Sequence, residues 1–406
     1  MTVFGEVTVR RWGYSGQNVG SVFPLDEALN LPASKYSHGL QRKVGMEVAR
    51  SSYEETIEAV TKGTGGRVPK RQAEQIAQVV SGDFENYYAN RPAKEAEGLL
   101  VMSTDGKGIV VRKEDLREAT RKAAETSSQK LKTRLSRGEK RNRKRMATVA
   151  TVYDIAAHRR TAESIMGQTE DAPQKRPKPE NKRVWASLHR PCGEVIEQAF
   201  AEAERRDPER KRTWLMLVDG QESQIREIAA ATKRHRTNVS VIQDFVHVLE
   251  YLWKAAYCFY KEGTKEAEAW VSKRATALLQ SKASEVAAGM RRSATRRSLS
   301  NEARQAVDKC ASYLLKNKKR LDYATALSNG WPIATGVIEG ACRHLVKDRM
   351  DITGARWSLD GAEAVLRLRA LRSSGDFEDY LAFHHRQEQL RNRRTQPSFA
   401  DLKIAA

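Results

Sequence analysis

LLVMSTDGKGIVVR, residues 99–112, is the stretch that decides the fold. Two apolar runs flank an Asp-Gly pair, a pattern typical of a β-hairpin that turns at Asp105 and Gly106. A further β-branched run, MATVATVYDI at 146–155, predicts a third strand. The sequence therefore predicts three antiparallel strands at the start of a sheet, with Asp105 at the end of the first strand.

Helices and strands alternate after these strands. The run WLMLVDG predicts a buried strand that ends in Asp219, and NVSVIQDFVHV predicts another that carries Asp244. Three antiparallel strands followed by alternating helices and strands are typical of an RNase H-like mixed sheet, so we expect an α/β fold. The remaining elements are predicted as helix 192–206, helix 221–235, an exposed connection at 174–183 and an all-helical insertion at 245–328.

A last helix is predicted within GWPIATGVIEGACRHLVKDRMDITGARW, residues 330–357. On a helical wheel it starts near Thr335 or Gly336 and has one apolar face. Glu339 falls at the edge of that face, and we expect it to be partly buried. The apolar face consists of Ile338, Ala341, Cys342, Leu345 and Val346, and the flanking cations are Arg343, Lys347 and Arg349.

The N-terminal part is predicted to be helical from residue 46. A helix capped near Ser52, a Gly-rich turn at 63–66 and a second helix opened by Pro69 resemble a helix-turn-helix unit, although an ordinary helical hairpin has the same pattern. The expected division is a loop-rich segment 1–45, a helix-turn-helix-like domain 46–95, a catalytic core 96–244 with a basic arm at 128–146, the helical insertion 245–328, the rest of the core 329–390 and a basic tail 391–406.

The charge balance points to a polyanionic partner. The chain of 406 residues has 72 Lys and Arg against 51 Asp and Glu, a formal charge of +21. Nine Lys or Arg residues between 130 and 145 face a single Glu, as expected of a segment that follows phosphates. We expect double-stranded DNA as the partner, with contacts from Lys70, Arg71, Lys140, Arg141, Arg143, Lys144, Arg145, Arg343, Lys347, Arg349 and Arg356.

Cysteine spacing and hydropathy favour a cytoplasmic protein. The four cysteines are scattered, without the paired spacing of a zinc ribbon or a disulfide framework. No run of 18 apolar residues occurs, and the N-terminus lacks the layout of a secretory signal. We expect a cytoplasmic protein that is located with the DNA and has no membrane partner.

Acidic residues at strand ends predict a metal site. Phosphodiester cleavage needs charge neutralisation at the attacking and leaving oxygens, which two Mg²⁺ ions bound by carboxylates supply. In an RNase H-like sheet the first and fourth strands are parallel neighbours, so Asp105 and Asp219 would converge, and Glu339 would join them. Each acid also has a structural alternative: Asp105 in a turn, Asp219 in a turn or as a helix cap, and Asp244 as a cap.

Several motifs together resemble one family. TDGKG, GEKRNRKRM, VYDIAAHRRT, LVDG, DFVHVLEYLWKAAYCFY and the block from GWPIATG to ARW are similar to bacterial insertion-sequence transposases of the ISKra type, from about residue 24 to about residue 390. These are DDE enzymes on an RNase H-like fold. The resemblance implies Mg²⁺-dependent cleavage of the element's inverted-repeat ends and strand transfer, with Mn²⁺ as a substitute metal.

The resemblance also implies site residues. Asp105 occupies the first acidic position and Glu339 the last, and Asp219 corresponds to the second. Asp244 and His247 match a C/DxxH motif, in a supporting role or with Asp244 as the alternative second acid. Some relatives carry cysteine pairs near the N-terminus, whereas the first cysteine here is Cys192, which puts zinc-dependent end recognition in doubt. Pairing of two ends implies at least a homodimer.

Three other functions stay open on the sequence. An RNase H-like nuclease or resolvase would use the same metals without strand transfer. A domesticated DNA-binding protein would have no catalysis. A serine or tyrosine recombinase, the latter with Tyr251 or Tyr257 as nucleophile, would form a covalent adduct with DNA.

Overall fold

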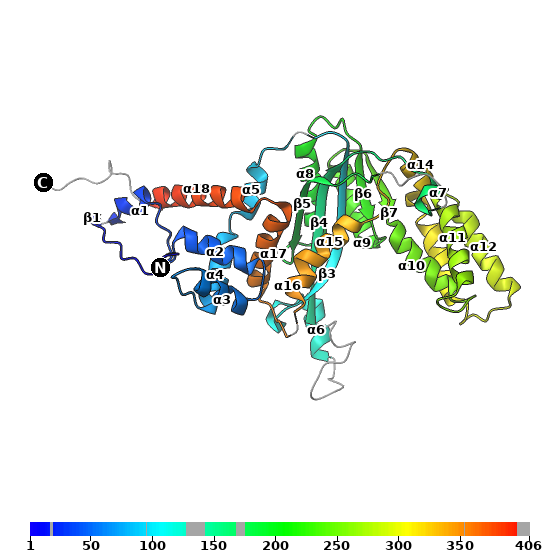
Figure 1. The fold of residues 1–406 in the computed structure, drawn as a ribbon, viewed down its shortest axis with the longest axis horizontal. Coiled ribbons are helices and arrows are strands. Elements are labelled where there is room, and N and C mark those ends of the chain that lie inside the picture. The colour runs from blue at the N-terminus through cyan, green and yellow to red at the C-terminus, as the bar shows by residue number, and fades with distance from the viewer. Residues whose placement is uncertain (17–18, 95, 127–142, 168–174, 353, 396–406) are drawn as a thin grey trace.

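A mixed five-stranded sheet forms the centre of the protein (Figure 1). The computed structural model describes residues 1–16, 19–94, 96–126, 143–167, 175–352 and 354–395. The strand order is β5-β4-β3-β6-β7, with β3, β4 and β5 antiparallel and β3, β6 and β7 parallel. The α/β class is therefore confirmed. The strands are β3 (Leu99–Val110), β4 (Lys144–Ile155), β5 (Glu180–Ser187), β6 (Trp214–Val218) and β7 (Val239–Gln243).

The hairpin predicted at Asp105 and Gly106 is wrong. β3 is one strand of 12 residues that pairs with β4 from Leu99↔Ile155 to Val110↔Lys144. The glycines serve close packing here, because a Cβ on Gly108 would lie 2.9 Å from the Lys144 side chain. The third antiparallel strand is instead β5, which begins inside the stretch predicted as an exposed connection.

The parallel pairs bring the predicted strand ends together. β3 and β6 are neighbours in the register Ser103↔Leu217, and β6 and β7 in the register Val218↔Gln243. The prediction that the first and fourth strands of the sheet are parallel neighbours is confirmed. All five residues of β6 are buried, as expected of a strand covered on both faces.

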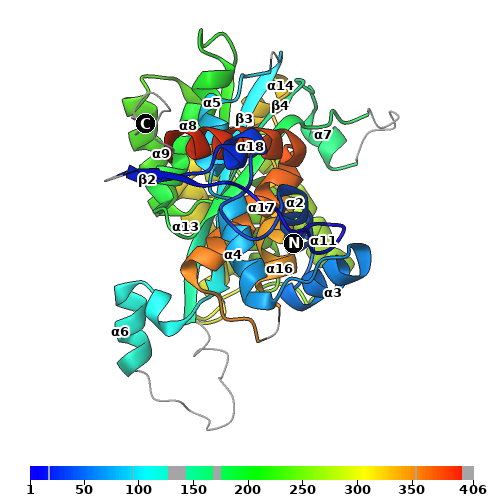
Figure 2. The ribbon, with the colours of Figure 1, turned by 90° about the vertical axis from the view of Figure 1, so that its left-hand side faces the viewer.

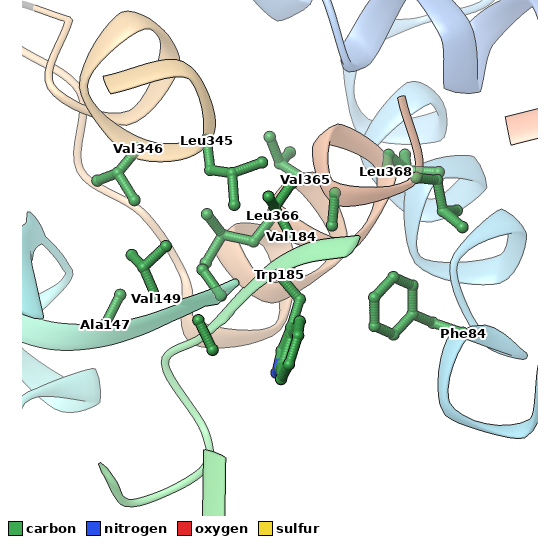
Figure 3. Packing of buried hydrophobic residues seen from close by; sticks show 14 of the residues in the cluster. Phe84, Ala147, Val149, Val184, Trp185, Leu345, Val346, Val365, Leu366 and Leu368 are labelled. Carbon is green, nitrogen blue, oxygen red and sulfur yellow. The ribbon is translucent and has the colours of Figure 1, made fainter. Parts of the chain in front are cut away.

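Helices cover the two faces of the sheet. Trp185 of β5 donates through Nε1 to Gln198 of α8 (Cys192–Arg206), so α8 lies on one face. The adjacent Val184 points to the other face by the alternation of a strand, where α17 (Leu359–Ser374) packs. Figure 3 shows this core, which includes Ala147, Val149, Val184, Leu345, Val346, Val365 and Leu366.

The N-terminal helices share this core. Ser52 caps α3 (Tyr53–Gly63) in a reciprocal capping box with Glu55, and Pro69 precedes α4 (Lys70–Val80). α2 (His38–Val48) crosses the boundary predicted at residue 45. α2 and α4 both pack on α17, in one hydrophobic cluster with the sheet. The other N-terminal elements are β1 (Tyr14–Gly16), β2 (Val19–Val22), α1 (Pro24–Ala28) and α5 (Phe84–Asn90). α6 (Glu118–Thr126) lies between β3 and β4 in the chain, and α18 (Phe377–Thr395) is the last helix.

A helical block lies beyond β7 at the other end of the molecule (Figure 1). It forms a second hydrophobic cluster with apolar residues of the sheet such as Val101 and Leu217. The helices of the predicted insertion are α10 (Phe245–Ala256), α11 (Lys265–Leu279), α12 (Ala283–Arg296), α13 (Gln305–Lys316) and α14 (Tyr323–Ser328). Two helices outside the insertion are α7 (Ala162–Ile165), which packs beside α11, and α9 (Glu222–Arg234), which connects β6 to β7. None of the described helices is both long and apolar enough to span a membrane.

One helix with an internal irregularity follows the block. It consists of α15 (Gly336–Ala341), a π-helical segment Cys342–Lys347 and α16 (Asp348–Met350). A helix starting near Gly336 was predicted. The π-helical segment, which the sequence pattern did not indicate, begins three residues after Glu339, and such segments are frequent at functional sites.

Candidate active site

The chain from Ile333 to Cys342 crosses the ends of two strands. The Ile333 carbonyl accepts a hydrogen bond from the Phe245 amide at 2.9 Å, just after β7. Thr335 Oγ1 donates to Asp244 Oδ2 at 2.6 Å. Cys342 Sγ donates to Asp105 Oδ2 at 3.2 Å, in the centre of the sheet. The helix that carries Glu339 is therefore held to predicted acidic residues at its start and at the beginning of its π-helical segment.

Asp105 lies in β3 and is half-buried. Its Oδ1 accepts from the Gly106 amide at 2.6 Å, and its Oδ2 lies 3.1 Å from Lys107 Nζ. Burial lowers the pKa of Lys107, but the hydrogen bond and charge of Asp105, with a smaller contribution from the charge of Glu339, outweigh burial and raise it. The carboxylates thus form a negative environment that favours a cation at this position.

Glu339 is exposed, so the expectation of partial burial is wrong. Its Oε1 lies 3.5 Å from Thr335 Oγ1, at the limit of hydrogen bonding. Cys342 follows three residues later, and such positions on a helix have Cβ atoms about 5–6 Å apart. Because Cys342 contacts Asp105 directly, the Asp105 and Glu339 side chains lie on neighbouring parts of one site.

Asp219 follows β6 at the start of a sharp turn. Its Oδ1 accepts from the Gln221 amide at 3.0 Å, so the turn role that the sequence left open is present. Gly220 has φ +98°, and a Cβ there would lie 2.8 Å from Gln243 Nε2, so the turn requires glycine. If the strand registers continue beyond their last pairs, Asp105, Asp219 and Asp244 occupy one row across β3, β6 and β7.

Asp244 is buried and caps α10. Its Oδ1 accepts from the Val246 amide at 3.0 Å, which confirms the capping role given as its structural alternative. Its second oxygen accepts from Thr335. His247 lies one turn into α10, with Nδ1 3.8 Å from Glu250 and its ring against Tyr251. The structure therefore gives Asp244 a clear structural role and shows no contact between His247 and the acids.

Tyr313 of α13 is a residue that the sequence reasoning missed. Its hydroxyl donates to the Asp219 carbonyl at 3.4 Å, and its ring stacks on Tyr251 at 4.1 Å. Burial raises the pKa of Tyr313, and the charges of Tyr251, Asp219 and Asp244 raise it further. Both aspartates therefore lie near this hydroxyl. No sequence signal links a tyrosine in the helical block to these acids.

Thr335, Lys107 and Cys342 were also missed as site residues. Burial raises the pKa of the Cys342 thiol, as do the charge of Asp105 and the hydrogen bond to it, which keeps the thiol protonated as a donor. Thr335 and Cys342 stand four residues before and three residues after Glu339. Helical spacing places all three on one side of the helix and could have indicated them.

Arg369 of α17 fixes the irregular part of this helix. It donates to the carbonyls of His344 at 2.9 Å and Leu345 at 3.1 Å, within the π-helical segment. It also donates to the carbonyl of Ala49 at 2.6 Å, at the end of α2. Burial, with nearby arginines, lowers the pKa of Arg369 to about 10. One buried arginine thus connects the N-terminal helices to the helix that carries Glu339.

The residues predicted to contact DNA fall into separate groups. Lys70 and Arg71 are exposed at the start of α4. Arg145 lies in β4, donates to the carbonyls of Leu188 and Asp115, and has its pKa lowered by burial, which gives it a structural role. Lys140 and Arg141 lie outside the described residues, as do most of the basic arm and the end of the basic tail. Arg143 and Lys144 are half-buried, and Arg349 is buried. The exposed residues of this set are Arg343, Lys347 and Arg356.

The donor set fits a hard divalent cation. Carboxylate oxygens are the ligands that Mg²⁺ prefers, and the Lys107 ammonium beside Asp105 shows where positive charge is favoured. Within the described part of the chain, no group of three or more His, Cys, Asp or Glu side chains that could hold a metal ion is found. The two-metal site at Asp105, Asp219 and Glu339 stays a prediction.

Comparison with known families finds no family model that matches the chain, and comparison with curated proteins finds no match either.

Proposed function

We propose that the protein is a metal-dependent DDE transposase with an RNase H-like core, which binds the ends of a bacterial insertion sequence and joins them to target DNA. One observation carries the proposal. Asp105, in the centre of the sheet, contacts the helix that bears Glu339, although the whole helical block separates the two residues in sequence. An acidic residue in the central strand that meets a helix bearing a second acidic residue fits phosphodiester chemistry.

The strand order supports the same proposal. Three antiparallel strands followed by two parallel strands, in the order β5-β4-β3-β6-β7, agree with an RNase H-like sheet. Asp105 lies in β3, Asp219 directly follows β6 and Asp244 directly follows β7. These three strands are consecutive in the sheet. Of these, Asp219 is half-buried and has a single backbone hydrogen bond through its carboxylate, whereas Asp244 is buried and caps α10. Asp219 is therefore the better second acid.

Asp105, Asp219 and Glu339 are the residues that would hold Mg²⁺ or Mn²⁺, which when bound supplies charge neutralisation at the attacking and leaving oxygens. The protein's own groups orient these carboxylates. Cys342 and Gly106 each donate to Asp105 and fix its two oxygens. Lys107 adds a positive charge beside the reacting phosphate. No covalent bond between protein and DNA is required.

DNA binding would involve two regions. α3 and α4 form the proposed helix-turn-helix unit, with Lys70 and Arg71 exposed at the start of the second helix. Arg343, Lys347 and Arg356 are exposed near the proposed site and suit phosphate contacts. Synapsis of two ends would require a homodimer or a larger assembly.

A joining assay tests the proposal. Labelled duplexes with the DNA that flanks the coding sequence on either side are incubated with the full chain, Mg²⁺ and a target plasmid. Wild type is expected to nick the ends and join them to the plasmid, whereas Asp105→Asn and Glu339→Gln are expected to do neither. Asp348→Asn is the matched control, because Asp348 lies on the same helix and pairs with His344 at 3.2 Å, away from Asp105.

The outcomes separate the other functions. Nicking without joining would favour a nuclease or resolvase. Wild type that binds the ends without nicking them would favour a non-catalytic DNA-binding protein. A protein–DNA adduct lost in Tyr251→Phe or Tyr257→Phe would favour a tyrosine recombinase. Full joining by Asp105→Asn would contradict the proposal directly.

A further inference from the structure

A cavity of about 360 Å³ lies between the N-terminal helices and the end of the helix that carries Glu339. Its walls come from α3, α4, α16 and the start of α17, and Figure 2 shows α16 beside α4. We call it the junction cavity. Its lining includes Tyr53, Arg349 and Trp357, with Lys70, Arg112 and Arg356 among the cations that also reach it.

Arg349 has buried donors without partners. Only 3% of the residue is exposed, and neither its Nε nor its Nη2 has a hydrogen-bond partner among the described residues. The hydroxyl of Tyr53, also buried, has none either. The guanidinium lies 4.8 Å from the Trp357 ring centroid and 5.4 Å from that of Tyr53. The two side chains that carry these three unpaired donors both belong to residues of the cavity wall.

A buried cation without hydrogen-bond acceptors is unfavourable in the free protein. Burial lowers the pKa of Arg349, and the charges of Tyr53, Glu55 and Glu54 oppose this only in part. The contacts with the two rings compensate for some of the lost hydration. The Nε and Nη2 edge of a guanidinium matches two oxygens of one phosphate, which would satisfy both donors at once.

The charged residues that line the cavity also favour an anion, and one that carries only a small negative charge. Lys70, Arg112 and Arg356 contribute positive charge, against Glu54 and Glu74, and Glu54 is already paired with Lys70. We propose that the junction cavity binds one phosphate group, which Arg349 and Tyr53 hold. The phosphate belongs either to a DNA backbone or to a free phosphate monoester, and the experiment below distinguishes these sources.

The position suits a DNA backbone. Arg349 follows Glu339 by ten residues of one helix, which is at most about 15 Å along the axis, because the α-helical rise is 1.5 Å per residue and the π-helical segment rises less. This distance corresponds to about four base-pair steps of 3.4 Å. DNA whose phosphate occupies the junction cavity would be held at a set distance from the proposed catalytic acids. It would also lie against α4, which lines the cavity. The binding itself does not depend on catalysis.

Thermal unfolding of the full chain in inorganic phosphate tests the site. Wild type is expected to melt at a higher temperature in phosphate than in chloride of equal ionic strength. Arg349→Met should weaken phosphate binding at least 10-fold, and Tyr53→Phe several-fold. Arg292→Met, which removes an exposed arginine of α12 in the helical block, should bind phosphate like wild type. Without phosphate, Arg349→Met should be at least as stable as wild type, because it removes an unpaired buried charge.

A second arm uses a 20-base-pair duplex and measures affinity against salt. If the source is a DNA backbone, Arg349→Met reduces the slope of log affinity against log salt by about 0.9, the value for one phosphate contact. If the slope is unchanged while phosphate binding is lost, the source is a free monoester. Equal phosphate affinity in wild type, Arg349→Met and Tyr53→Phe would overturn the proposal, whether or not the protein joins DNA. So would a wild type that does not bind phosphate.

Discussion

Asp219 and Asp244 should respond differently to substitution, and the difference decides which of them acts in catalysis. Asp244→Ala removes a helix cap, about 1 kcal/mol, and a hydrogen bond from Thr335 to a buried carboxylate, about 1.5–3 kcal/mol. Its free energy of unfolding should therefore fall by about 3 kcal/mol. Asp219→Ala removes one backbone hydrogen bond at a half-buried turn and should lose less than about 1 kcal/mol.

The loss of joining activity should show the opposite order, with substitution of Asp219 more harmful than substitution of Asp244. If Asp219 binds the metal, Asp219→Asn removes several kcal/mol of transition-state stabilisation, on the order of a 10³-fold loss of joining. Asp244→Asn keeps an oxygen that can accept from Thr335 or Val246, so it should stay folded and keep most activity. The isosteric asparagine variants separate loss of charge from loss of packing.

Two measurements check this prediction. Urea unfolding, followed by circular dichroism, gives the free energy of unfolding of each variant. Variants are compared with the same slope of this free energy against urea concentration. The joining assay gives the activity of the variants that stay folded. A stable but inactive Asp244→Asn together with an active Asp219→Asn would refute the assignment of the second acid. An Asp244→Ala variant as stable as wild type would refute the structural role given to Asp244.

Two further predictions concern buried charges. Burial alone would raise the pKa of Glu202, but Arg183, Arg206 and Arg205 lower it from 4.5 to about 2, a difference worth about 3 kcal/mol. Because this pKa is lowered in the folded state, the stabilisation is complete above pH 4.5 and is lost as the pH falls toward 2. The stability difference between wild type and Glu202→Gln, measured by urea unfolding from pH 6 to pH 2, should shrink by about 3 kcal/mol; a constant difference would contradict the role of these arginines. Arg369→Met removes hydrogen bonds to three carbonyls, those to Leu345 and Ala49 buried and that to His344 part-buried, and should cost about 3 kcal/mol or more in thermal unfolding. Arg369→Lys should recover part of this loss, and an unaffected melting temperature would exclude the link between α2 and the π-helical segment.

Local patterns predicted many elements correctly. α8 and β6 lie where hydrophobic periodicity placed them, and Ser52 caps α3 as its sequence suggests. These features depend on neighbours within a few residues, so a single sequence contains the relevant information. The helical nature of residues 245–328 followed for the same reason.

The pairing of β3 and β4 could not be predicted in the same way. An Asp-Gly pair favours a turn in isolation, but in β3 the partner strand supplies the backbone hydrogen bonds along all 12 residues. β5 was missed because a stretch rich in Lys and Pro precedes it, and only its buried half, from Arg183 onward, reads as a strand. Tertiary pairing outweighed local preference in both cases.

The sequence by itself determined that this is an α/β protein with a strong positive charge, a helical insertion and acidic residues at the ends of buried strands. Only the tertiary structure decided which side chains meet. It placed Cys342 against Asp105, Thr335 between Asp244 and Glu339, and a buried Arg349 beside an open cavity. Contacts between residues far apart in the chain depend on how the sheet and helices pack, and no local pattern contains that information.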